Sequence, residues 1–158
     1  MLRFGAIALL LLAAGGAQAQ QRTQDRAQLD SISVHLFLSK SGMLSPDVET
    51  IEGFGAWNFA LQGKDIEPGE RFYSILIRVK FTAPREIFAK GRQAEVVMTD
   101  RRTRKVVKRE RISGVYIGSH GWTHVPVWVE DGACGPFEIV ASGGGKRIVK
   151  QLEAACGE

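Results

Sequence analysis

The stretch from Phe72 to Thr82, FYSILIRVKFT, constrains the fold more than any other part of the chain. Apolar and aromatic side chains recur there at every second position: Tyr73, Ile75, Ile77, Val79 and Phe81. This period of two is typical of a β-strand with one face in a core, whereas a helix would scatter the same residues around its circumference. We therefore expect a central strand here, with Ile75, Ile77 and Val79 buried.

Short strands are expected on both sides of this stretch. Alternating apolar residues predict them over 31–39, 56–62, 93–99, 104–112, 114–118, 122–130, 136–142 and 146–153. The segment 56–62 should present Trp57, Phe59 and Leu61 on one face. Pro126 cannot donate a hydrogen bond to a ladder, so its strand should lie at a sheet edge or a bulge. The glycine triplet at 143–145 should form the turn of the last hairpin.

The number and spacing of these segments predict the fold class. About seven to eight short strands separated by turns, with no helix-length amphipathic stretch, indicate an all-β fold and an antiparallel β-sandwich. An immunoglobulin-like topology is the preferred arrangement, and a small barrel is the alternative. The domain should run over 31–158, after a flexible polar lead-in over 20–30.

The first residues have the pattern of a secretory signal peptide. Arg3 supplies a positive charge, an apolar run follows from Ala6 to Ala14, and Ala17-Gln18-Ala19 is a small-residue cleavage site. The apolar run is shorter than the roughly 20 residues that a membrane anchor requires. We expect cleavage after Ala19 and a bacterial protein that is periplasmic or secreted, with no transmembrane segment in the mature chain.

The chain contains two cysteines, Cys134 and Cys156. In an oxidising compartment such a pair predicts a disulfide, here at the open end of the last hairpin, and two free thiols are the alternative. Direct opposition of the cysteines would place Ile148 opposite Ser142. Packing of Ile148 and Leu152 in the core requires that the two strands of the hairpin pair with a shift of one residue from this register. A β-bulge near the cysteines would allow both the core packing and the disulfide.

Positive charge is concentrated in one segment of a chain whose net charge is +4. The segment from Asp100 to Arg111 holds two acidic and seven basic residues: Arg101, Arg102, Arg104, Lys105, Lys108, Arg109 and Arg111. Protection of an edge strand, together with solubility, is a sufficient explanation. The functional interpretation is a strip that binds phosphate or carboxylate groups. An envelope protein, an anionic envelope polymer or a lipid headgroup suits an exported protein better than nucleic acid does.

Sequence patterns for catalysis or metal binding are weak. His120 and His124 are four residues apart, but they lie in a glycine-containing loop that enters a strand, and this spacing imposes no geometry there. Zinc requires a further ligand, which Glu130 or Asp131 could supply only by folding back. Neither a G-x-S-x-G nucleophile elbow nor a phosphate loop occurs. Surface histidines beside aromatic residues are the expected state.

Trp57, Trp122 and Trp128 lie in or beside loops and strand ends. The favoured interpretation places all three between the sheets, and the alternative is exposure for stacking on sugars or for protein contact. The sequence as a whole predicts an exported, non-catalytic binding protein that needs no cofactor. The alternative function is a small secreted hydrolase or metal-binding protein that uses His120 or His124 with nearby carboxylates.

Overall fold

The computed structural model describes residues 26–130 and 134–155. These ranges contain β1 (Gln28–Leu38), a short 3-10 helix η1 (Val48–Thr50), β2 (Gly55–Trp57), β3 (Ala60–Gln62), β4 (Phe72–Thr82), β5 (Ile87–Asp100), β6 (Val106–Ile117), β7 (Trp122–Val129), β8 (Gly135–Gly143) and β9 (Lys146–Ala154). The predicted signal peptide, residues 1–19, lies outside the described residues. Within the described ranges, no helix has the length and hydrophobicity needed to cross a membrane.

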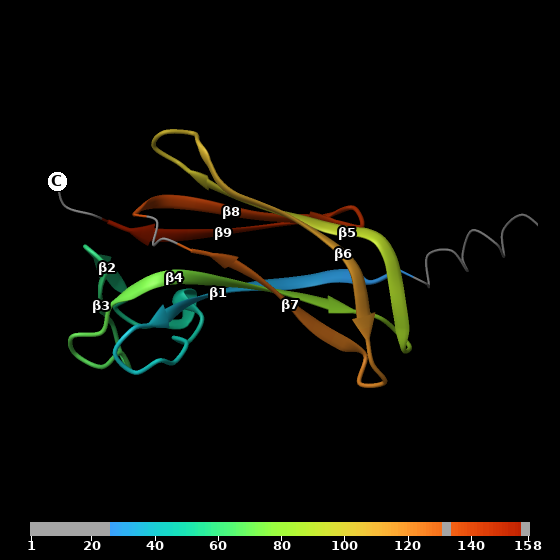
Figure 1. Cartoon of the computed structure of the whole chain (residues 1–158), viewed down its shortest axis with the longest axis horizontal. Helices are drawn as coiled ribbons and strands as arrows, with labels where there is room; N and C mark the ends of the chain where they lie inside the picture. The colour runs from blue at the N-terminus through green and yellow to red at the C-terminus, as the bar shows by residue number, and fades with distance from the viewer. Residues whose placement is uncertain (1–25, 131–133, 156–158) are drawn as a thin grey trace, which may run out of the picture.

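Two antiparallel sheets form the layers of a β-sandwich (Figure 1). One sheet has the strand order β1-β4-β7 and the other has the order β6-β5-β8-β9, while the small β2-β3 hairpin lies at one end. In an immunoglobulin-like sandwich the A, B and E strands share one sheet and the C, F and G strands share the other. Here β1, β4 and β7 occupy the A, B and E places, β5, β8 and β9 occupy the C, F and G places, and β6 flanks β5. The predicted sandwich is confirmed, and the barrel alternative is wrong because the two sheets remain separate.

The core lies between the two layers and is filled as the periodicity predicts. Ile75, Ile77 and Val79 of β4 have no exposed surface. From the facing sheet, β5 contributes Ala94, Val96 and Met98, which are also buried. Burial of one large aliphatic side chain contributes about 1.5–3 kcal/mol to stability, so these alternating positions drive the packing of the two sheets.

Tyr73 does not belong to this core, contrary to the sequence prediction. Its side chain is 50% exposed, whereas Phe72 is only 1% exposed. Leu36 of β1 lies opposite Ile75, but Leu38 lies opposite Phe72, so two steps along β1 correspond to three along β4. The extra residue is a β-bulge, and a shift of one residue exchanges the two faces of a strand.

The segment predicted as one strand over 56–62 is a hairpin. Asn58 and Phe59 join β2 to β3 with positive φ angles of 48° and 65°. Positive φ at both central residues is the type I′ geometry that matches the twist of a two-residue hairpin. The expected shared face is therefore wrong: Leu61 is 7% exposed, while Trp57 on the other side of the turn is 58% exposed.

Two further strand boundaries differ from the prediction. Strand β1 begins at Gln28 and not at Ser31. Ala27, just before the strand, and Leu29, within it, are buried. The end of the predicted lead-in thus belongs to the domain, whereas residues 20–25 lie outside the described residues. The segments predicted over 104–112 and 114–118 form the single strand β6, with Gly114 at a φ of 67° beside an irregularity in the β5–β6 ladder.

Both β6 and β7 are edge strands, as the sequence predicts. On β6, Lys108 and Glu110 lie opposite the buried residues Met98 and Val96, so they belong to the inward face of the sheet. Their side chains form an ion pair at 3.5 Å. Charged side chains on the inward face of an edge strand oppose the addition of another strand, which makes edge protection one role of this part of the basic segment.

The last hairpin has the register that core packing requires. Ile148 lies opposite Ala141 and Leu152 lies opposite Phe137, and the last described pair is Gly135 with Ala154. Cys134 directly precedes β8, whereas Cys156 lies outside the described residues. The disulfide therefore remains a prediction.

Candidate functional site

The basic segment divides into a part with ion-pair partners and a tip without them. Arg109 and Arg111 on β6 both contact the carboxylate of Glu95, at 3.0 and 3.3 Å. Arg101 forms an ion pair with Glu153 of β9. Since Lys108 pairs with Glu110, four of the seven predicted binding residues have carboxylate partners within the fold.

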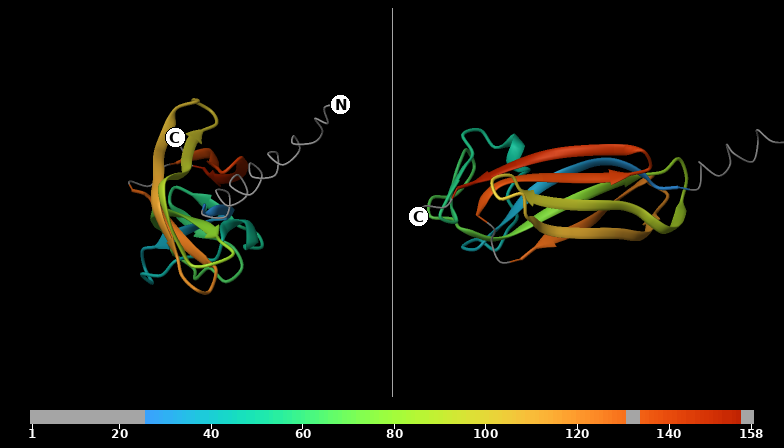
Figure 2. Two further views of the ribbon diagram at one scale, coloured as in Figure 1. Left: turned by 90° about the vertical axis from the view of Figure 1, so that its right-hand side faces the viewer. Right: turned by 90° about the horizontal axis from the view of Figure 1, so that it is seen from above.

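The remaining three cations lie in the turn between β5 and β6. Arg102, Arg104 and Lys105 are exposed and form no ion pair with the residues that the structure describes. We call these three residues the basic tip. The hairpin that carries them stands away from the rest of the sandwich (Figures 1 and 2), so the uncompensated charge is located on a protrusion.

Asp100 organises the turn below the basic tip. Its Oδ1 accepts hydrogen bonds from the backbone N–H groups of Arg102 and Thr103, at 2.7 and 2.9 Å. The backbone N–H of Arg104, which has a φ of 61°, donates to the carbonyl oxygen of Asp100 at 2.8 Å. The hydrogen bond from Thr103 is the main reason that the pKa of Asp100 lies below its usual value. The turn is thus held in one conformation by an ionised aspartate.

Apolar side chains follow the basic tip directly. Val106 is 50% exposed and Val107 is 40% exposed at the start of β6. The end of the hairpin therefore combines three free cations with two exposed aliphatic side chains. Such a combination suits contact with a surface that offers both anions and apolar groups.

A second surface covers the outward side of the three-stranded sheet. Because Val127 and Val129 of β7 are buried, the alternate positions of that strand face outward. We call this surface the tryptophan face; its residues are Trp122, His124, Pro126 and Trp128 of β7, Leu76, Arg78, Lys80 and Thr82 of β4, and Ser31, Ser33 and His35 of β1. Leu76 and His35 are buried, and the other residues are at least partly exposed.

The three tryptophans are exposed, and the favoured prediction of burial is wrong. Trp122 is 45% exposed, Trp128 is 40% exposed and Trp57 is 58% exposed. Trp122 and Trp128 alternate with the valines that fill the core, so burial of the valines directs both indoles outward. The alternation of Val125, Val127 and Val129 in the sequence could have indicated this arrangement.

The two histidines contact the same indole. The ring of Trp122 contacts His120 with a centroid distance of 4.9 Å and His124 with a centroid distance of 5.2 Å, both in edge-to-face geometry. Burial lowers the pKa of His124, and the charges of Arg78 and Lys80 lower it further. The prediction of histidines beside an aromatic residue is confirmed.

Within residues 26–130 and 134–155, the structure does not bring a carboxylate to these histidines as a metal or hydrolase site would require. Glu130 follows the end of β7, six positions after His124, which corresponds to about 20 Å along a strand. Asp131 lies outside the described residues. Among the described residues, no group of three side chains of the metal-binding types lies close together.

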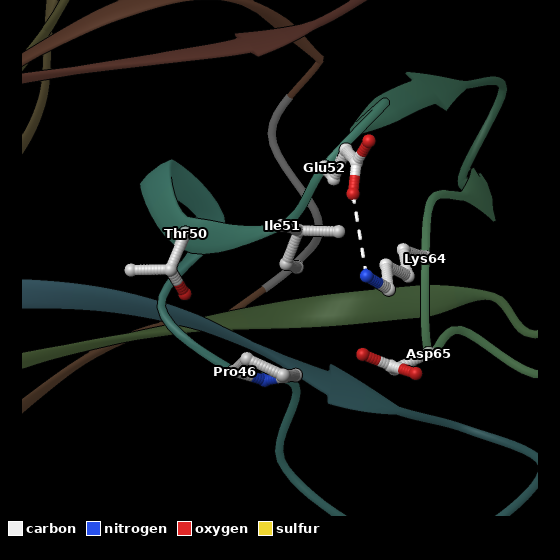
Figure 3. Close-up of a pocket in the computed structure, with 6 residues that line it drawn as sticks. All are labelled: Pro46, Thr50, Ile51, Glu52, Lys64 and Asp65. Carbon is white, nitrogen blue, oxygen red and sulfur yellow. Dashed lines mark hydrogen bonds and ion pairs between the residues drawn. The ribbon is translucent and has the colours of Figure 1, made fainter.

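A hollow of about 250 Å³ lies beside η1 (Figure 3). It is lined by Pro46, Thr50, Ile51, Glu52, Lys64 and Asp65. Glu52 and Lys64 pair across it at 3.4 Å, and the hydroxyl of Thr50 donates to the carbonyl oxygen of Asp47 at 2.7 Å. Glu52 and Lys64 are thus engaged with each other and Thr50 with the backbone, and the lining offers no nucleophile with an adjacent base.

No protein-family model matches the chain, and no curated protein matches it in sequence. Function is therefore inferred from the geometry of the surfaces described above.

Proposed function

We propose that this chain is an exported, non-catalytic β-sandwich protein that binds an anionic lipid surface through the basic tip. The observation that supports the proposal is the net positive charge of Arg102, Arg104 and Lys105, which form no ion pair with the described residues, on a protruding hairpin (Figure 2). The nearby carboxylate of Asp100 offsets this charge only in part. The other cations of the basic segment have carboxylate partners and serve the fold.

The chemistry of the hairpin favours a lipid surface over other anionic partners. Arginine and lysine donate charge-assisted hydrogen bonds to phosphate oxygens. Each basic residue near an anionic membrane contributes about 1 kcal/mol, so the three cations of the basic tip support a weak, reversible attachment. Val106 and Val107, which are exposed beside the cations, add apolar area that can enter the interface below the headgroups.

Export rests on the sequence pattern of the first 19 residues. The signal-peptide proposal requires that the mature protein begin at Gln20. Expression of the full chain in a bacterium, followed by amino-terminal sequencing of the periplasmic fraction, tests this part. A cytoplasmic protein that retains Met1 would contradict it.

Vesicle binding tests the lipid proposal. The mature protein should bind vesicles of phosphatidylglycerol and phosphatidylcholine at low salt, and the binding should weaken as salt increases. The variant with Arg102, Arg104 and Lys105 all changed to Ser should lose the binding, while its melting temperature stays unchanged. A comparison variant with Arg109→Ser and Arg111→Ser should retain more of the binding than the triple variant, because these two residues share the carboxylate of Glu95, which already offsets part of their charge.

Three results would refute the lipid proposal. The first is equal binding to vesicles of phosphatidylcholine alone, and the second is undiminished binding by the triple variant. The third is strong binding to polyglutamate without any binding to anionic vesicles, which would indicate an acidic protein as the partner.

A further inference from the structure

The tryptophan face is separate from the basic tip, because it belongs to the other sheet of the sandwich. Trp122 and Trp128 lie on the same side of β7, six positions apart, and the rise of a strand separates them by about 20 Å. His124 and Pro126 occupy the two outward positions between them. Both indoles are thus exposed near the ends of an edge strand, and the ring of Trp122 also contacts His120 and His124.

Cationic side chains lie between these platforms. On the neighbouring strand β4, Lys80 is opposite His124 and Arg78 is opposite Pro126. Residues at diagonal positions of an antiparallel pair lie about 7–8 Å apart, within reach of long and aromatic side chains. Lys80 is therefore adjacent to Trp122, and Arg78 is adjacent to Trp128.

Arg78 is the cation of this face that the fold leaves uncompensated. Lys80 forms an ion pair with Asp30 at 2.9 Å. Arg78 is partly buried, and within the described ranges it has no carboxylate partner. The depressed pKa of His124, to which both cations contribute after burial, is consistent with a positive potential at this point. The guanidinium group can offer a forked set of donors to a planar anion.

Neutral hydrogen-bonding groups complete the surface. Ser33 on β1 is opposite Arg78, and Thr82 on β4 is opposite Trp122. The exposed part of the face thus combines two indole rings, one cation without an ion pair and hydroxyl groups. Leu76, which lies opposite Trp128, is only 5% exposed, so the face lacks the contiguous exposed apolar centre that a protein interface has. Single-stranded nucleic acid also uses aromatic rings and cations, but its affinity depends on several simultaneous phosphate contacts, and only one cation is uncompensated here.

The geometry points to a binding site for an acidic oligosaccharide on the tryptophan face. The indoles of Trp122 and Trp128 stack on sugar rings, and the guanidinium of Arg78 pairs with a carboxylate of a sugar that lies between them. A ligand that reaches both indoles must be extended and must repeat a ring, which describes a chain of sugar acids better than a single sugar or a compact anion.

Tryptophan fluorescence titrations test this inference with oligogalacturonate and with its methyl ester, which has the same rings without the charge. The wild-type chain should bind the acid more tightly than the ester. Arg78→Gln should weaken binding of the acid about tenfold and leave the ester unaffected, whereas Arg78→Lys should retain most of the preference for the acid. Trp128→Ala should weaken binding of both forms about fivefold.

Control variants distinguish loss of this site from other causes of weakened binding. Arg92→Gln removes an exposed arginine of the other sheet and should leave binding unchanged. The triple variant of the basic tip should also retain full binding, so failure of the lipid proposal and failure of this one are distinguishable. Circular dichroism of each variant excludes loss of the fold, and Trp122→Ala gives a second test if Trp128→Ala does not fold.

Three results would overturn the inference. One is the absence of saturable binding to oligogalacturonate, and another is equal binding of the acid by the wild-type chain and the Arg78→Gln variant. The third is tighter binding of oligodeoxythymidylate than of oligogalacturonate at equal charge, which would assign the face to nucleic acid.

Discussion

The carboxylate of Glu70 accepts a hydrogen bond from the backbone N–H of Ser41 at 3.0 Å, across 29 positions of the chain. Its other oxygen accepts from the N–H of Lys40 at 3.1 Å. Glu70 is only 1% exposed. Burial acts to raise its pKa, but the hydrogen bonds from Ser41 and Lys40 and the charge of Lys40 outweigh burial, and the pKa lies below its usual value. Glu70 thus ties the turn after β1 to the segment that enters β4.

Glu70→Gln is expected to lower the melting temperature at neutral pH, because an amide accepts weaker hydrogen bonds than a carboxylate does. The folded-state pKa of Glu70 is depressed, so its contribution to stability is fully present above the unfolded-state pKa of about 4.3 and is lost as the pH falls through the folded value. Melting curves recorded between neutral and acid pH should show a smaller decrease in melting temperature for the variant than for the wild-type chain. Glu67→Gln is the matched control, since Glu67 pairs with Lys40 at the surface. Equal behaviour of the two variants would contradict this role of Glu70.

The bulge in β4 makes two positions of the same apolar alternation, Tyr73 and Ile77, unequal in burial. Ile77→Ala should lower the free energy of unfolding by about 2–5 kcal/mol, because it leaves a cavity in a fully packed core. Tyr73→Ala should cost under about 1.5 kcal/mol, since the exposed ring loses mainly its contact with Phe59, at a centroid distance of 5.7 Å. Denaturant unfolding of both variants measures the difference. Similar losses would place Tyr73 in the core and contradict the bulge.

Asp100→Ala is expected to loosen the basic tip while the sandwich stays folded. The variant removes the acceptor for the N–H groups of Arg102 and Thr103, so amide exchange at these two positions should accelerate. The pKa of Asp100 is depressed mainly by the hydrogen bond from Thr103. In the wild-type chain, ionised Asp100 should therefore stabilise the turn fully at neutral pH. This stabilisation begins to fall below the unfolded-state pKa of about 3.9 and is lost as the pH passes through the lower folded-state pKa.

A control for this prediction lies on the same hairpin. Glu110→Gln removes the partner of Lys108 but leaves the acceptor in the turn intact. Its amide exchange at positions 102 and 103 should match that of the wild-type chain. Acceleration in both variants would indicate a general opening of the hairpin and would contradict a specific role of Asp100.

The predicted disulfide between Cys134 and Cys156 has a direct chemical test. The oxidised protein, unfolded in denaturant, should contain no thiol that reacts with a titrant until a reductant is added. Replacement of both cysteines by Ala should lower stability by about 3 kcal/mol in the chain-entropy model. Two reactive thiols in the oxidised, unfolded protein would show that the bond is absent.

Periodicity and chemically restrictive residues made much of the fold predictable. The period of two located Ile75, Ile77 and Val79 in the core, because the alternation of a strand depends only on residues that are neighbours in the chain. Pro126 indicated an edge strand because the absence of an N–H is a property of the residue itself. The glycines at 144 and 145, with φ angles of 59° and 82°, form the last turn for a similarly local reason.

Tertiary pairing decided the features that distinguish the candidate surfaces. The bulge that exposes Tyr73 arises from the register between β1 and β4. Glu95 contacts both Arg109 and Arg111, which lie 14 and 16 residues away along the chain, and these contacts leave the turn as the part of the basic segment without an ion pair among the described residues. Arg78 and Trp128 come together only because β4 and β7 are adjacent. The sequence by itself determined which residues alternate along a strand and which can form a turn, since both are local properties of the chain. Only the folded sheets decided which charges have ion-pair partners and which aromatic rings lie beside a cation, because these depend on contacts between distant segments.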